Sequence, residues 1–308
     1  MMDLAASLLS PEFFAAILRV STPIILVAMG VLISERAGVV NIGAEGMMLS
    51  GAFCGVVFSA YTGSATVGLV AAIVAGMVGG LFMSFAVHVL RANLFLSGIA
   101  LNLAASAGTI LALFALTGEK GISGTLDSEV LPSVHIPWVQ DLPVLGTILS
   151  GHHILTYVAF LSVPAVAIFM MRTPTGLRMR AVGENPEAAK ATGLSVIRLQ
   201  LQAFLLCGVF AGAGGAFLSM GYVSWFSQNM TAGRGFIALA AEVMGAGGAY
   251  GTLAASLLLG SVDVLAIALA GEGLPSELLQ AAPYVVTVLA LALYGLRQTK
   301  QKTIGTVH

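Results

Sequence analysis

Length and composition place the chain in a lipid environment. It has 308 residues, of which 58% are hydrophobic and 9% are charged, and its formal net charge is -1. So few polar residues cannot cover the surface of a water-soluble globule, and the chain must therefore use lipid as its solvent. The basic residues form no large patch, which excludes an electrostatic argument for nucleic acid as a partner.

Long apolar runs between charged and turn residues predict an all-α fold, a polytopic bundle of about eight to ten transmembrane segments. The runs form one transmembrane domain over residues 1–308, without a visible soluble domain. The seventh run is short and glycine-rich and contains Glu242, so we expect a re-entrant or broken helix there. In chain order the nine predicted segments are approximately 13–34, 39–61, 66–90, 94–117, 154–171, 200–222, 236–249, 252–270 and 281–296.

The distribution of lysine and arginine predicts the orientation, because these residues accumulate on the cytoplasmic side. With a cytoplasmic C-terminus, nine crossings put the N-terminus outside, and a miscount of one segment would move it inside. This orientation leaves Lys120 and Arg234 in outer loops, whereas most other basic residues are cytoplasmic. It makes residues 118–153 an irregular outer loop and residues 172–199 the one sizeable cytoplasmic loop.

The cytoplasmic loop contains the signals of a complete short helix. Asn185 can cap the free amide groups, and Pro186 suits the first helical position. Glu187 complements the positive end of the helix, and Gly193 can adopt the left-handed conformation that ends it. A helix of about seven residues is unstable alone in water, where roughly 12 are needed, so it must dock on something. The residues alone leave two docking sites for this helix: a groove on a partner protein, which small alanine side chains would suit, or the membrane surface.

Three stretches of the chain resemble one transporter family. The first is GENPEAAKATG at 183–193, followed by SVIR at 195–198 and AGAGGA at 211–216. The second is ERAGVVNIGAEGMM at 35–48, and the third is NLFLSGIALN at 93–102. Together they are similar to permease subunits of bacterial ATP-binding-cassette (ABC) importers, in the branch that includes ribose, branched-chain amino acid and nucleoside permeases. The second stretch most resembles nucleoside and simple-sugar members.

This resemblance implies a transport protein of the bacterial cytoplasmic membrane rather than an enzyme. It implies a cytoplasmic ABC ATPase, a second and often non-identical permease subunit, and an extracytoplasmic solute-binding protein as partners. ATP and magnesium would be used by the ATPase, because this chain has no G-x-x-x-x-G-K-[ST] phosphate loop and no cofactor is expected in it. The positions that match the ATPase-coupling helix are Gly183, Glu184, Asn185, Pro186, Glu187, Ala188, Ala189 and Gly193.

Five polar side chains are predicted to lie at membrane depth, where they are costly unless they face a polar cavity or a partner. One interpretation is that they line the substrate path, where carboxylate and amide groups bind hydroxyl groups or the edge of a base. The other, which we favour for the asparagines, is that they bond between helices, cap helix ends or contact the second permease. For the glutamates we favour the pore or the subunit interface, because burying an unpaired carboxylate is costly. The five are Asn41, Glu45, Asn93, Asn102 and Glu242.

The expected function is therefore ATP-driven import, with a nucleoside as the first choice of solute, a simple sugar second and a branched-chain amino acid third. The main alternative is an autonomous secondary transporter or channel, in which Glu45 and Glu242 would carry protons or sodium ions. We expect no metal site, because His152 and His153 have no Cys, Asp or Glu nearby at ligand spacing. Two pairs of glycines, 76 with 80 and 208 with 212, predict close helix packing rather than a site.

Overall fold

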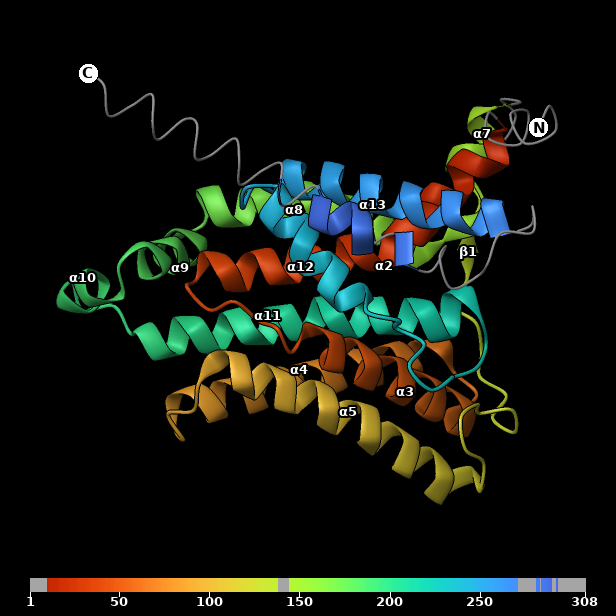
Figure 1. The fold of residues 1–308 in the computed structure, drawn as a ribbon, viewed down its shortest axis with the longest axis horizontal. Helices are drawn as coiled ribbons and strands as arrows, with labels where there is room; N and C mark the ends of the chain where they lie inside the picture. Colours follow the sequence, from red (N-terminus) through yellow and green to blue (C-terminus); the bar gives the residue numbers. More distant parts are fainter. Residues whose placement is uncertain (1–9, 138–143, 271–280, 283, 290–291, 293–308) are drawn as a thin grey trace.

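The computed structural model describes residues 10–137, 144–270, 281–282, 284–289 and 292. The described part is almost entirely helical, as predicted, and its elements run in the order shown in Figure 1. They are α2 (Pro11–Arg36), α3 (Ala44–Thr62), α4 (Ala65–His88), α5 (Leu94–Thr117), β1 (Ser133–Val134), α7 (Leu145–Leu149), β2 (His152–His153), α8 (Ile154–Arg172), α9 (Pro174–Glu184), α10 (Pro186–Ala191), α11 (Val196–Phe217), η1 (Leu218–Tyr222), α12 (Arg234–Met244) and α13 (Ala249–Ala270).

Seven of the described helices are long and apolar enough to cross a membrane: α2, α3, α4, α5, α8, α11 with its extension, and α13. They coincide with seven of the predicted segments. The predicted segment 236–249 contains the short helix α12, which has 11 residues and ends at Met244, before α13 begins at Ala249. The last predicted segment, 281–296, falls largely outside the described residues.

Helix α2 forms the centre of the bundle. Every residue from Val20 to Ser34 is buried, and the helix packs against α8, α11, α12 and α13. In Figure 1, α8 and α13 lie on one side of α2, and α11 followed by α3, α4 and α5 lie on the other. Its hydropathy equals that of α4, α8 and α13, which are far less buried, so contacts with the neighbouring helices, and not composition alone, set its central place.

Small residues bring α4 and α11 into close contact. The two glycine pairs predicted to pack face each other, because a Cβ added to Gly76 would clash with the backbone of Gly208. One added to Gly212 would clash with the backbone of Ala72. Without side chains between them the two backbones approach closely, which is the usual way for helices to associate in lipid. The predicted packing role is confirmed.

The outer loop has more structure than the sequence predicts. Residues 118–153 contain a two-stranded antiparallel sheet, in which Ser133 pairs with His153 and Val134 with His152. The short helix α7 lies between the two strands. These elements are too short for a sequence pattern to reveal, and the pairing joins residues 20 apart at Ser133 and His153.

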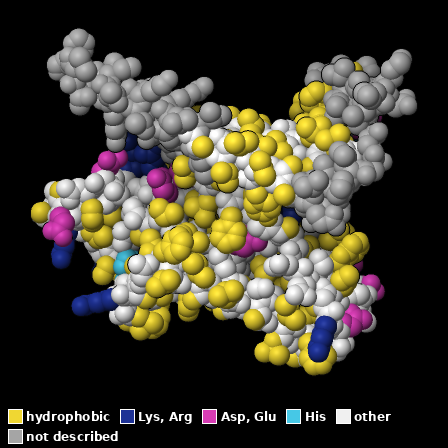
Figure 2. Space-filling model, viewed as in Figure 1, with side chains coloured by type: hydrophobic (Ala, Val, Ile, Leu, Met, Phe, Trp, Pro, Cys, Tyr) yellow, Lys and Arg dark blue, Asp and Glu magenta, His cyan; other side chains and the backbone are white. Residues whose placement is uncertain are grey.

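The surface agrees with a lipid environment. Figure 2 shows hydrophobic side chains over the middle of the bundle, whereas most charged side chains in this view lie towards its two ends. Large apolar residues that are at least half exposed occur on α4, α5 and α8, including Val70, Leu103 and Leu161. The chain is a multi-pass membrane protein.

Candidate functional site: the coupling loop and the half-helix α12

The predicted short cytoplasmic helix is present as α10. Asn185 caps it, since its side-chain oxygen accepts a hydrogen bond from the Ala188 amide at 3.0 Å. Pro186 occupies the first turn, and Gly193 follows the helix with a φ of 86°. Glu187 and Ala188 are exposed, whereas Ala189 is buried at 5% exposure. The helix therefore presents one free face and anchors itself through Ala189.

A second helix, α9, precedes α10 and was not predicted from the sequence. Helix α9 begins after Thr173, whose hydroxyl accepts a hydrogen bond from the Gly176 amide at 3.1 Å. Pro174 fills its first turn. This Thr-Pro pair was a usable start signal, because threonine caps helices and proline suits the first helical position. The predicted cytoplasmic loop therefore contains two helices joined at Asn185, of which the sequence predicted only the second.

The end of α9 lies directly against the end of α2. A Cβ added to Gly183 would clash with the carbonyl group of Arg36 and lie 3.0 Å from the Gly38 amide nitrogen. In addition, Gln200 of α11 donates a hydrogen bond to the Ala37 carbonyl oxygen at 3.3 Å. The segment of α9 and α10, called the coupling loop here after its predicted role, is therefore in backbone contact with the turn at 37–43 that joins α2 to α3.

At the other end of that turn, Glu45 binds the beginning of α12. Its Oε1 accepts hydrogen bonds from Thr231 Oγ1 at 2.6 Å and the Gly233 amide at 2.9 Å. Its Oε2 accepts one from the Gly235 amide at 2.6 Å. The first amides of a helix lack partners within the helix and carry partial positive charge, so a carboxylate is well placed there. Glu45, which is 9% exposed, is satisfied by these three donors.

The start of α12 approaches α3 closely enough to require glycine. A Cβ added to Gly235 would lie 2.6 Å from the Glu45 Cα atom and 2.7 Å from its Oε2. Beside this contact, Arg234 forms an ion pair with Asp263 of α13, with 3.4 Å between Nη2 and Oδ2. The first turn of α12 is thereby fixed to both α3 and α13.

Arg36 binds the opposite end of the same helix. Its Nε and Nη2 donate to the Gly247 carbonyl oxygen at 2.8 and 2.6 Å, and Nη2 also donates to the Ala246 carbonyl oxygen at 3.1 Å. Both carbonyl groups belong to the turn between α12 and α13, in which Ala246 and Gly247 have φ values of 53° and 66°. A cation here complements the negative end of the helix.

The two charged residues Arg36 and Glu45 therefore bracket α12, and both come from the stretch ERAGVVNIGAEGMM at 35–48. Their signs match the helix dipole at each end. The partners of Arg36 lie 210 and 211 residues away in the chain. No sequence pattern could have paired it with them.

The three asparagines bond between helices or cap helix ends. Asn41 accepts from the Gly43 amide at 3.1 Å and donates to Cys207 Sγ at 3.2 Å. Asn102 fastens the same turn to α5, since it accepts from the Gly46 amide at 2.8 Å and donates to the Ile42 carbonyl oxygen at 3.0 Å. Asn93 caps α5. The structure brings Asn41, Glu45 and Asn102 together around the α2–α3 turn and leaves Asn93 apart.

Glu242 lies near the end of α12 and is 1% exposed. Among the described residues its Oε1 has no hydrogen-bond partner. Glu45 and Glu242 therefore occupy opposite ends of α12. It remains a prediction that the substrate path is lined by Asn41, Glu45, Asn93, Asn102 and Glu242.

The described part of the chain contains no group of three or more His, Cys, Asp or Glu side chains that could hold a metal ion. His152 instead bonds through Nε2 to the Ile148 carbonyl oxygen at 2.7 Å.

Comparison with known proteins agrees with this architecture. The chain is 34% identical to the guanosine ABC transporter permease protein NupQ of Bacillus subtilis, with 95% of each chain covered. It is 37% identical to the nucleoside ABC transporter permease protein NupC of Lactococcus lactis, with 91% of each covered. It is 36% identical to a putative glucose ABC transporter permease protein of Haloferax volcanii, with 86% of this chain and 78% of that one covered. No solved structure matches it significantly.

These relatives are transport components rather than enzymes. Residues 13–293 match the family model described as the branched-chain amino acid transport system permease component. The match spans all seven long helices, the coupling loop and α12. The chain therefore belongs to the family of branched-chain amino acid transport system permease components.

Proposed function

We propose that this chain carries nucleosides through the bacterial cytoplasmic membrane as one of two permease subunits of an ABC importer. The observation that carries the choice of solute is the likeness to two permeases named for guanosine and nucleosides, over at least 91% of each chain. A simple sugar is the second candidate, favoured by the 36% identity to a putative glucose permease. An autonomous secondary transporter is not favoured, because all three relatives are named as ABC transporter permeases.

The exposed face of α10 is the proposed contact with the ATPase. Six residues are too few for a helix that stands alone in water, and Ala189 supplies its only buried side chain. Its exposed face is made of small and polar side chains, among them Glu187, Ala188 and Ala191, which permit close approach of a partner's groove. The partner would bind ATP and magnesium, and an extracytoplasmic protein would deliver the solute.

The contacts described above support a route by which the ATPase acts on the pore. A displacement of α10 moves α9, whose Gly183 touches the end of α2 at Arg36. Arg36 in turn holds the turn after α12. Short broken helices are typical of alternating-access transporters, where they line the solute site. We therefore assign α12 the role of the moving gate.

The test is a bulky residue on the free face of α10. Ala188→Trp should abolish co-purification of the ATPase and reduce nucleoside uptake at least tenfold, while the permease still elutes as a folded protein. Ala92→Trp is the matched control, because Ala92 is an exposed alanine in the α4–α5 connection at the same end of the bundle. Ala189 is unsuitable, because it is buried within this chain and a large side chain there would disturb α10 itself.

Normal ATPase binding and uptake with Ala188→Trp would contradict the coupling role of α10. Loss of both with Ala92→Trp as well would mean that the effect is not specific to α10.

A further inference from the structure

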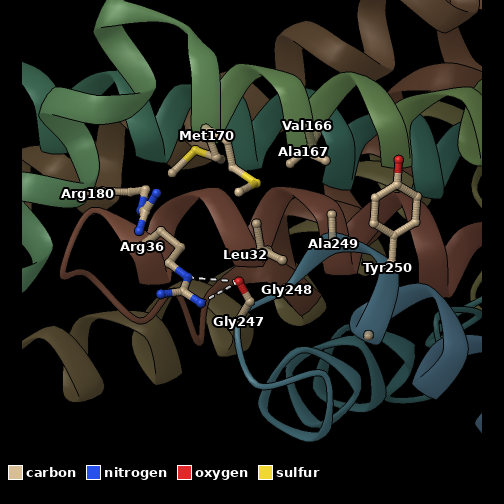
Figure 3. Close-up of a pocket in the computed structure, with 12 residues that line it drawn as sticks. Leu32, Arg36, Val166, Ala167, Met170, Arg180, Gly247, Gly248, Ala249 and Tyr250 are labelled. Carbon is tan, nitrogen blue, oxygen red and sulfur yellow. Dashed lines mark hydrogen bonds between the residues drawn. The ribbon is translucent and has the colours of Figure 1, made fainter.

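A cavity of about 290 Å³ opens between α2, α8, α9 and the beginning of α13. Its walls are apolar and include Leu32, Val166 and Met170. Two arginines, Arg36 and Arg180, lie together at one end, as Figure 3 shows. The remaining lining residues are Ala167, Met171, Gly247, Gly248, Ala249, Tyr250 and Gly251.

Neither cavity arginine has a carboxylate within salt-bridge distance in the described part of the chain, where the ion pair is Arg234 with Asp263, away from this cavity. Glu242 lies near enough to Arg36 to interact with it electrostatically. Arg36 is bonded to backbone carbonyl groups, and its Nη1 makes none of these bonds. In Figure 3 the guanidinium group of Arg180 lies beside the side chain of Arg36, whose own guanidinium group is turned to the Gly247 carbonyl oxygen. Two like charges side by side repel each other, and an anion between them would relieve that repulsion.

The surroundings indicate what kind of anion fits. Below the arginines the walls are aliphatic, which a free phosphate ion would not match. Met171 and Tyr250, at the edge of the cavity, are 66% and 63% exposed, so the cavity is open along the apolar surface of α8 and α13. An amphiphile fits both the basic end of the cavity and its apolar walls, because it has an anionic head and an apolar body.

The depth of the cavity agrees with a lipid. Arg36 ends α2 and Arg180 belongs to α9, so both lie at the end of the bundle that the distribution of basic residues predicts to be cytoplasmic. The cytoplasmic leaflet carries anionic lipids, and basic pockets between helices on that side are suited to their head groups. We infer that this cavity binds the phosphate group of an acidic phospholipid between Arg36 and Arg180, with the upper part of its acyl chains against Leu32, Val166 and Met170.

Such a lipid would add a link between two parts of the molecule. Arg180 belongs to α9 of the coupling loop, and Arg36 holds the turn after α12. A phosphate bound to both would tie the coupling loop to the end of the half-helix. This inference concerns lipid binding by the folded chain and does not depend on the identity of the solute.

Native mass spectrometry of the full-length, delipidated permease tests this inference with three probes: dioctanoyl phosphatidylglycerol, dioctanoyl phosphatidylcholine and inorganic phosphate. We expect one phosphatidylglycerol to bind at least tenfold more tightly than phosphatidylcholine, and phosphate to compete poorly. Arg180→Gln should weaken phosphatidylglycerol binding about tenfold, which corresponds to one charge-assisted hydrogen bond. Arg178→Gln, which alters an exposed arginine of the same helix, should leave it unchanged.

A second variant separates lost binding from misfolding. Ala167→Phe fills the cavity and keeps both arginines, and it should also remove the bound phosphatidylglycerol. Equal affinity for the two lipids, or unchanged affinity in both Arg180→Gln and Ala167→Phe, would overturn the inference. Competition by inorganic phosphate as strong as by phosphatidylglycerol would also overturn it and assign the arginines to a free anion.

Discussion

Replacement of Glu45 by glutamine tests whether this carboxylate holds α12 in place. The carboxylate accepts hydrogen bonds from two backbone amides, Gly233 and Gly235, and from the Thr231 hydroxyl. Glutamine has the same size but only one acceptor oxygen, and its N–H groups would oppose one of the amides. A buried donor left without a partner costs about 1–3 kcal/mol. We therefore expect the first turn of α12 to be held about 2 kcal/mol less tightly, which is a roughly 30-fold increase in local opening.

Hydrogen exchange at residues 233–244 in lipid nanodiscs measures this opening directly. Glu45→Gln should accelerate exchange there about 30-fold and leave α4 and α11 unchanged. Thr231→Val removes one of the three bonds, costs about 1 kcal/mol and should accelerate the same amides about fivefold. Glu129→Gln is the matched control, since Glu129 is exposed in the outer loop, and should have no effect.

The alternative role of Glu45, a direct contact with the solute, gives a different result. In that case Glu45→Gln would change the KM for uptake while exchange in α12 stayed at the wild-type rate. That combination would refute the assignment of Glu45 as a clamp on the half-helix.

Three further predictions concern packing, coupling and pH. Gly208→Ala should lower the unfolding temperature, because overpacking at the α4–α11 contact costs about 1–3 kcal/mol, whereas Gly108→Ala, whose new Cβ would meet nothing within 4 Å, should not lower it. Arg36→Gln should reduce uptake at least tenfold without releasing the ATPase, and full uptake would contradict the proposed route. Burial lowers the pKa of His153 below its ordinary 6.5, so the folded state resists protonation and should lose stability as the pH falls below about 6.5. Thermal unfolding between pH 8 and 5 should show this loss in the wild type and in the exposed-site variant His135→Asn, but less of it in His153→Asn.

Local features of the fold were accessible from the sequence. The cap at Asn185, the proline after it and the left-handed Gly193 are each determined by neighbouring residues, and the structure confirms all three. The shortness of the segment around Glu242 was also correctly predicted, because glycines after it end the helix. Helix α9 was missed although Thr173 and Pro174 carried its start signal.

The bonds that Glu45 and Arg36 make to the two ends of α12 could not be predicted from the sequence, because they join residues far apart in the chain. Glu45 meets donors 186 to 190 residues away, and Arg36 meets carbonyl groups 210 and 211 residues away. Hydrophobic periodicity places each helix in the membrane but says nothing about which helix ends meet. For the same reason the sequence could not reveal that the Thr231 hydroxyl and two backbone amides are the hydrogen-bond partners of Glu45, whose predicted place at the pore or the subunit interface stays a prediction.

The role of this chain as an ATP-driven permease is tested most directly by nucleoside uptake into proteoliposomes of defined composition. With the ATPase, the second permease and the solute-binding protein present, labelled guanosine should accumulate only when ATP is supplied on the ATPase side. Vesicles that contain this chain alone should accumulate none, with or without a proton or sodium gradient. Gradient-driven accumulation by the chain alone would contradict the account and support a secondary transporter.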